Sequence, residues 1–250
     1  MSSSADKWIR PLSRNPQGRL RLFCLPFAGG GTSAYRPWVR QLPPDVDTYA
    51  VCLPGREDRI RETPFTRMEP LIAALTDVLL PFLDRPYVLY GHSLGAVIGF
   101  ELAHALLRAG AREPVRLVFS GRGAPDGPAP QPLTHLADGP FISALNQRYG
   151  GIPQALLNEP ELLALFVPVL RADLGILEHY TCRSREPLPY ALTVVGGSSD
   201  PMVPAAALND WQRHTRGPFA VHFLEGEHFF IQSNQARWIA FLTAELRRCT

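Results

Sequence analysis

The stretch YVLYGHSLGAVIGFELAHALLRAG, residues 87–110, decides the fold because it holds a strand, a sharp turn and a helix in immediate succession. Its first residues are continuously apolar, as in a strand that is buried on both faces. The next five residues, GHSLG, fit the pattern G-x-S-x-G, in which a strained turn presents a serine and the flanking glycines leave room for the backbone. With a strand before it and a helix after it, this pattern favours a nucleophilic Ser93 over a plain glycine-rich turn.

Similar short apolar runs recur along the chain and alternate with segments of helical length. The other predicted strands cover residues 21–26, 48–54, 115–121, 190–197 and 220–226. The predicted helices cover residues 34–42, 69–83, 94–109, 205–215 and a last segment from about residue 234. Strands and helices in alternation predict an α/β fold, with a mostly parallel central sheet and helices on both of its faces.

One interval, about residues 124–185, breaks this alternation, because it is far longer than a single crossover between parallel strands needs. It opens in the proline- and glycine-rich segment GRGAPDGPAPQP and then has helical composition over residues 141–149, 154–158 and 161–180. We interpret it as an inserted helical lid whose apolar underside covers a pocket. An ordinary helical subdomain packed on the core is the alternative.

The length of 250 residues, 46% of them hydrophobic, is enough for one large core, so residues 19–250 are predicted to form a single domain. Residues 1–18 are largely polar and contain proline and glycine, which predicts a flexible N-terminal arm. No N-terminal segment has the apolar core of a signal peptide, and no run is long enough to cross a membrane. We therefore expect a cytoplasmic protein with no membrane partner.

Charge and cysteine content argue against other classes of partner. The formal net charge is +2 and no basic tail stands out, so nucleic acid is not an expected partner. The four cysteines are widely spaced and form no CxxC pair, which predicts no metal site. Nothing in the sequence requires more than a monomer.

A serine hydroxyl becomes nucleophilic at neutral pH only when a base accepts its proton and a third group orients that base. In a sheet of this kind, an acid and a histidine should follow the serine in chain order, each after a later strand. Asp200 follows the last predicted strand but one, and His228 follows the last. These two residues are the predicted partners of Ser93. Asp173 in the insertion and Asp210 in a helix are weaker candidates for the acid.

The glycine-rich segment FAGGGTSA, residues 27–34, follows another predicted strand and has three candidate ligands: phosphates, the pyrophosphate of a dinucleotide, or the negative oxygen that develops during acyl transfer. A P-loop needs a lysine after its glycines, and Lys7 is the only lysine of the chain. The segment matches the G-x-G-x-x-A of dinucleotide sites, but no acidic residue stands at the tip of the second strand. The remaining interpretation is an oxyanion hole formed by the backbone N–H groups of Ala28 and Leu94.

Six segments in order give the chain a more specific resemblance than GHSLG alone. They are LPFAGGGTSAYRPW, LPGREDR, YGHSLGA, SGRGAP, GGSSDPMVP and GEHFF. In these segments the chain resembles the stand-alone type II thioesterases of polyketide and nonribosomal peptide biosynthesis, within the α/β-hydrolase superfamily. The resemblance covers nearly the whole chain after the N-terminal arm. It implies Ser93 as nucleophile, Asp200 as orienting acid, His228 as base, Ala28 and Leu94 as oxyanion donors, and the insertion as a lid.

The resemblance also implies a reaction, which is hydrolysis of an acyl thioester carried on the phosphopantetheine arm of an acyl carrier protein or domain, without a metal or bound cofactor. Enzymes of this family clear stalled or wrongly primed acyl groups from a synthase. Arg56, Arg59 and Arg61 are candidate contacts for the acidic carrier, although solvated surface is their favoured role. The alternatives are another serine hydrolase of this fold, such as a carboxylesterase or a chain-releasing thioesterase, and a non-catalytic binding module.

Overall fold

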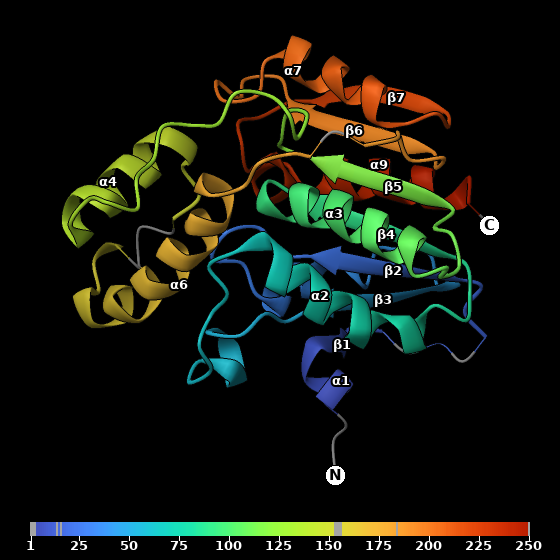
Figure 1. Cartoon of the computed structure of the whole chain (residues 1–250), viewed down its shortest axis with the longest axis horizontal. Helices are drawn as coiled ribbons and strands as arrows, with labels where there is room; N and C mark the ends of the chain where they lie inside the picture. Colours follow the sequence, from blue (N-terminus) through green and yellow to red (C-terminus); the bar gives the residue numbers. More distant parts are fainter. Residues whose placement is uncertain (1–3, 14, 16, 153–156, 184, 250) are drawn as a thin grey trace.

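The central feature of the molecule is one sheet of mostly parallel strands (Figure 1). The computed structural model describes residues 4–13, 15, 17–152, 157–183 and 185–249. Within these residues, seven strands pair in the order β1-β3-β2-β4-β5-β6-β7. Only β1 runs antiparallel to its neighbour, so the predicted α/β fold is confirmed. The strands are β1 (Ile9–Pro11), β2 (Leu20–Leu25), β3 (Val46–Val51), β4 (Tyr87–His92), β5 (Arg116–Ser120), β6 (Leu192–Gly197) and β7 (Phe219–Leu224).

The sheet is covered on both faces, which explains why its strands read as continuous apolar runs. Successive side chains of a strand point to opposite faces. Phe23 and Leu25 of β2 therefore join the core beneath α2 and α3, whereas Leu22 and Cys24 join the core beneath α9. Figure 1 shows α2 and α3 on one side of the sheet and α9 on the other. These helices are α2 (Met68–Leu79), α3 (Leu94–Arg108) and α9 (Gln235–Arg247).

The beginning of the chain departs from the predicted arm. Residues 4–11 form the short helix α1 (Ser4–Trp8) and then β1, which pairs with β3 and places Ile9 opposite Val51. Trp8 is 8% exposed and Ile9 is 1% exposed, and both belong to the core. The prediction of a flexible arm is therefore wrong for these residues. Two apolar side chains and a free sheet edge that needs hydrogen-bond partners outweigh the polarity of the rest of the segment.

The insertion forms two main helices, α4 (Asp138–Tyr149) and α6 (Pro160–Glu178). Figure 1 shows both of them at the end of the sheet toward which β2 and β5 point. The two halves of α6 differ, because Leu162, Leu165 and Phe166 are 41–57% exposed whereas the apolar residues from Val167 onward, except Pro168, are buried. The second half of α6 thus docks on the body of the protein. The helix predicted at 154–158 lies mostly outside the described residues.

The shorter elements link the strands to these helices. The predicted helix at 34–42 is instead a 3₁₀ helix with Pro37 inside it. Among the described residues, no helix has both the length and the apolarity needed to cross a membrane. The remaining short elements are η1 (Thr32–Trp38), η2 (Glu57–Arg59), η3 (Leu80–Phe82), α7 (Ala205–Asn209), η4 (Asp210–His214) and α8 (Phe230–Ser233).

Candidate active site

Ser93 occupies the strained turn between β4 and α3 that its sequence pattern predicts. Its backbone has φ 54° and ψ −113°, a conformation that residues other than glycine rarely adopt. A Cβ atom on Gly91 would lie 2.0 Å from the carbonyl oxygen of Gly95, and one on Gly95 would lie 2.5 Å from that of Leu25. Both glycines are therefore required by close backbone packing, and together they aim the serine at the carboxyl end of the sheet.

The structure brings Ser93, His228 and Asp200 into one hydrogen-bonded series. The Nε2 atom of His228 lies 3.1 Å from the Oγ atom of Ser93, and its Nδ1 atom lies 2.8 Å from Oδ2 of Asp200. The three residues are 3–8% exposed, so little water competes for these bonds. Because a carboxylate only accepts hydrogen bonds, Nδ1 carries the proton and Nε2 is left to accept the serine proton.

The other predicted acids lie elsewhere. Asp210 is paired with Arg213 at 3.1 Å, and Asp173 is paired with Arg56. Asp200 follows β6 and His228 follows β7, as the sequence predicts. Oδ1 of Asp200 accepts the backbone N–H of Met202 at 2.9 Å, which holds the carboxylate in the orientation that His228 needs.

His92, the residue before Ser93, packs against the ring of His228. Its ring is fully buried, and its centroid lies 5.2 Å from that of His228. Burial, with a smaller contribution from His228, holds the pKa of His92 well below its ordinary value. His92 therefore stays neutral, so it adds no positive charge beside the imidazolium that His228 would become. Its Nδ1 atom lies 2.9 Å from Oγ of Ser120, which fixes the ring.

The two predicted oxyanion donors are both available. Leu94 is the first residue of α3, and the first N–H groups of a helix have no partner within it. Ala28 lies in the tight turn that the N–H of Gly30 closes onto the carbonyl oxygen of Phe27 at 2.8 Å. Among the described residues, no protein acceptor is bound to the N–H of Ala28 or Leu94. Both groups are thus free to bind a developing negative oxygen.

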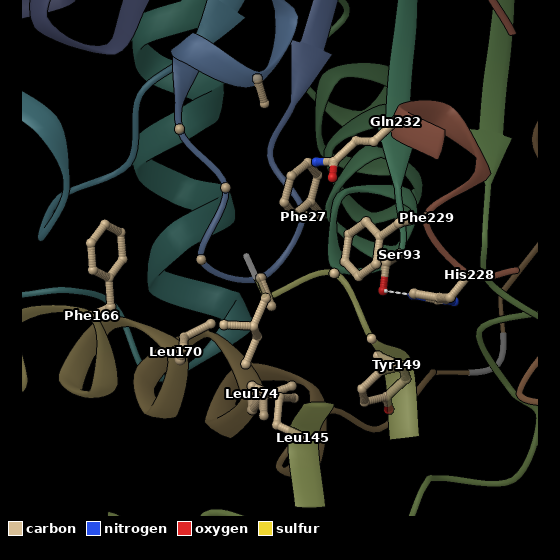
Figure 2. A pocket seen from close by; sticks show the side chains of 18 of the residues that line it. Phe27, Ser93, Leu145, Tyr149, Phe166, Leu170, Leu174, His228, Phe229 and Gln232 are labelled. Carbon is tan, nitrogen blue, oxygen red and sulfur yellow. Dashed lines mark hydrogen bonds between the residues drawn. The ribbon is translucent and has the colours of Figure 1, made fainter. Parts of the chain in front are cut away.

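An apolar cavity of about 360 Å³ opens beside Ser93 and His228. Figure 2 shows its far wall, which Leu145 of α4 and three residues of α6, Phe166, Leu170 and Leu174, contribute. A chain of methylene groups suits this lining, because it would leave no polar atom of its own unpaired there.

A second cavity, of about 290 Å³, shares Tyr149 and His228 with the first. Arg122 and Asp210 are among its lining residues, so it offers charged side chains that the first cavity lacks. Burial lowers the pKa of Arg122. His228 thus borders both cavities, and only the second has charged arginine and aspartate side chains in its lining.

Of the three candidate arginines, the two within LPGREDR are not solvated surface, and the favoured prediction for them is wrong. Arg56 and Arg59 are each 5% exposed, whereas Arg61 is exposed. Arg59 donates to the carbonyl oxygen of Cys52 at 2.7 Å and lies over the ring of Trp8 at 4.2 Å. A guanidinium group is planar and has several hydrogen-bond donors, so it can be buried when acceptors and an aromatic ring surround it. The charged composition of the segment instead suggests an exposed position.

Arg56 and Glu57 instead hold the glycine-rich segment in place. The Nη1 atom of Arg56 donates to the carbonyl oxygen of Gly30 at 2.8 Å. Glu57 accepts the hydroxyl of Thr32 at 2.7 Å and the N–H of Ser33 at 3.0 Å. Burial opposes the charge of Glu57, but these hydrogen bonds hold its pKa below the ordinary value. This role was not predicted from the sequence. The one sequence feature that points to it is the position of LPGREDR at the end of a predicted strand.

The same contacts disfavour a dinucleotide at the glycines. Oδ2 of Asp173 accepts the N–H of Gly29 at 2.8 Å, and Glu57 takes the N–H of Ser33. A pyrophosphate would need such N–H groups and would be repelled by both carboxylates.

Comparison with known proteins agrees with this geometry. The thioesterase domain family model matches residues 20–246. A curated relative, linear gramicidin dehydrogenase LgrE of Brevibacillus parabrevis, is 36% identical over 98% of this chain and 94% of its own length. The structure of RedJ, a thioesterase of the prodiginine pathway in Streptomyces coelicolor, matches with 35% identity and a TM-score of 0.86, covering 91% of this chain and 86% of RedJ. That of BorB, a type II thioesterase from the borrelidin biosynthetic cluster, matches with 30% identity and a TM-score of 0.87, covering 98% and 100%.

The likenesses to LgrE and BorB include the insertion as well as the sheet, because each spans nearly the full length of both proteins. The name of LgrE is that of a dehydrogenase, whereas the family model and both solved structures are thioesterases. The chain therefore belongs to the thioesterase family, and it is a thioester hydrolase related to the type II thioesterases of polyketide and nonribosomal peptide pathways.

Proposed function

We propose that this protein hydrolyses acyl groups from the phosphopantetheine arm of an acyl carrier domain, and so clears stalled or wrongly primed chains from a polyketide or nonribosomal peptide synthase. The observation that carries the proposal is the series Ser93, His228 and Asp200 at the mouth of an apolar cavity. The pathways named for RedJ and BorB supply the kind of synthase.

In the first step, Oγ of Ser93 attacks the thioester carbonyl carbon while Nε2 of His228 accepts the hydroxyl proton. Asp200 stabilises the imidazolium through Nδ1. The carbonyl oxygen becomes negative and accepts hydrogen bonds from the backbone N–H groups of Ala28 and Leu94. One such donor typically contributes ~10²- to 10³-fold in kcat.

In the second step, the tetrahedral intermediate collapses and the carbon–sulfur bond breaks. The imidazolium of His228 returns its proton to the leaving sulfur, so the carrier departs as a thiol and Ser93 holds the acyl group as an ester. Water then attacks this ester while His228 accepts a proton from the water. The bond between the acyl carbon and Oγ breaks, His228 returns the proton to Oγ of Ser93, and the carboxylic acid leaves. The reaction as proposed uses the protein's own side chains and water.

The two cavities suggest how substrate lies in the site. The apolar cavity suits the acyl chain, and the second cavity, which also borders His228 and has Arg122 in its lining, suits the amide-containing arm that carries the sulfur. In this arrangement His228 lies beside the sulfur that it must protonate. The insertion then acts as a lid, because α4 and α6 form the wall of the acyl chamber.

The test compares turnover of acyl groups on an intact carrier protein with turnover of oxygen esters of the same chain length. We expect a higher kcat/KM for the carrier thioester and loss of both activities in Ser93→Ala. Equal or faster hydrolysis of the oxygen esters would instead support a carboxylesterase. A titration with NAD(P)H, followed by nicotinamide fluorescence, checks the alternative that the name of LgrE raises; we expect no saturable binding.

A further inference from the structure

A buried ion pair joins the insertion to the body of the protein. The Nη2 atom of Arg56 lies 2.8 Å from Oδ1 of Asp173, and Nη1 lies 3.0 Å from Oδ2. The side chains are 5% and 1% exposed. Two buried charges with this geometry depend on each other, because removal of either one leaves the other unpaired in an apolar surrounding.

Both members of the pair also bind the backbone of the glycine-rich segment. Asp173 accepts the N–H of Gly29 at 2.8 Å, and Arg56 donates to the carbonyl oxygen of Gly30 at 2.8 Å. These are the two residues that directly follow Ala28, whose N–H is a proposed oxyanion donor. The pair therefore fixes the backbone directly after the peptide group that carries that N–H.

The two partners come from different parts of the fold. Arg56 follows β3 in the body of the protein, whereas Asp173 lies in the docked half of α6. Leu170 and Leu174, one turn before and one residue after Asp173, line the apolar cavity. The position of α6 thus sets the cavity wall and the glycine-rich segment together.

We infer that Arg56 and Asp173 are positioning residues, which hold the N–H of Ala28 in place and make a complete oxyanion hole depend on the docking of α6. The inference rests on the proposed serine mechanism but not on the carrier as substrate. Neither side chain contacts the reacting atoms; both act through Gly29 and Gly30.

The first experiment measures kcat and KM of Asp173→Asn with an acyl carrier thioester and with an activated oxygen ester. Asparagine keeps the shape of the side chain, but it places an N–H₂ donor where Arg56 and the N–H of Gly29 already donate. We therefore expect kcat to fall ~10²-fold for both substrates while KM changes little. Glu62→Gln is the matched control, because Glu62 pairs with Arg59 at 2.6 Å in the same segment, and no hydrogen bond or ion pair of Glu62 to residues 27–34 is present in the described structure. Its activity should stay within about twofold of the wild type.

The second experiment separates positioning from simple stabilisation. The double variant Arg56→Met, Asp173→Leu removes both charges and fills the space, a change that often leaves a protein as stable or more so. We expect its melting temperature to recover relative to Asp173→Asn while kcat stays ~10²-fold low, because no side chain then binds the N–H of Gly29 and the carbonyl oxygen of Gly30.

Recovery of wild-type kcat in the double variant, or wild-type kcat in Asp173→Asn, would overturn the inference. The activated ester keeps this test independent of the proposed function. If the wild type fails on the carrier thioester but Asp173→Asn still loses ester hydrolysis, the carrier proposal fails and the positioning role stands.

Discussion

The two halves of the site are built in different ways. Ser93, Asp200 and His228 each follow a strand of the sheet, at the ends of β4, β6 and β7, and their hydrogen bonds to one another involve no residue of the insertion. The glycine-rich segment is instead held by Arg56 from the body and Asp173 from α6. The groups proposed to move protons are fixed by the core, whereas a group proposed to stabilise charge depends on the insertion.

This difference predicts that damage to the two halves has different signatures. A change among the proton-moving residues should abolish chemistry whatever α6 does. A change in the glycine-rich segment should lower kcat by less. The size of that loss should depend on which side chains of α6 contact the segment.

The largest effect is expected for Asp200→Asn. The amide would donate toward Nδ1 and favour the tautomer with the proton on Nε2, so we expect kcat to fall ~10⁴-fold with the fold intact. Single-turnover kinetics with the activated ester measure this. Asp84→Asn is the control, since the Asp84 side chain is 61% exposed and pairs with Arg21 at the start of β2. A loss of less than about tenfold in Asp200→Asn would contradict the assignment of the acid.

A smaller loss, of ~10²-fold in kcat, is expected for Gly29→Ala. Gly29 has φ 73°, and a Cβ atom there would lie 2.5 Å from Cδ2 of Leu170 on α6. The clash should shift the backbone and turn the N–H of Ala28. Gly110→Ala controls for backbone strain, because Gly110 has φ 64° and a methyl group added there would meet nothing within 4 Å.

The same prediction can be sharpened by relieving the clash. Adding Leu170→Ala to Gly29→Ala removes the obstructing atom, so part of the lost kcat should return. If the double variant is no faster than Gly29→Ala, strain at the glycine rather than contact with α6 accounts for the loss.

The smallest effect is expected for Leu174→Ala, which enlarges the wall of the acyl cavity. We expect the ratio of kcat/KM for a longer acyl chain over a shorter one to rise by about tenfold, measured across a series of acyl groups on one carrier. Leu162→Ala on the same helix is the control, because Leu162 is 49% exposed and lies outside the cavity lining. An equal shift in both variants would show that the cavity does not select the chain.

The sheet and the three residues of the series could be predicted because local sequence determines them. A strand buried on both faces must be apolar throughout, and the residues at the ends of such strands converge on one edge of a parallel sheet. The serine turn carries its own glycines. These signals need no knowledge of distant contacts.

The role of Arg56 could not be predicted in the same way. Its partner Asp173 is 117 residues further along the chain, and their pairing depends on how the insertion docks. The strand β1 was not predicted for a related reason. A strand of three residues is too short to show a periodic pattern, and β1 is stabilised by pairing with the free edge of β3. Contacts that follow from docking leave little local trace.

The location of Asp173 on α6 has a consequence for protein engineering. Exchanging insertions between related enzymes is an obvious route to a new acyl range, because α4 and α6 shape the chamber. Such a graft would also replace the support that Asp173 gives to the N–H of Gly29 in the glycine-rich segment. If a chimaera binds the new acyl group but hydrolyses it slowly, the first change to make is an aspartate at the position equivalent to 173, where it can pair with Arg56. Changes to the residues that line the chamber should follow only after that.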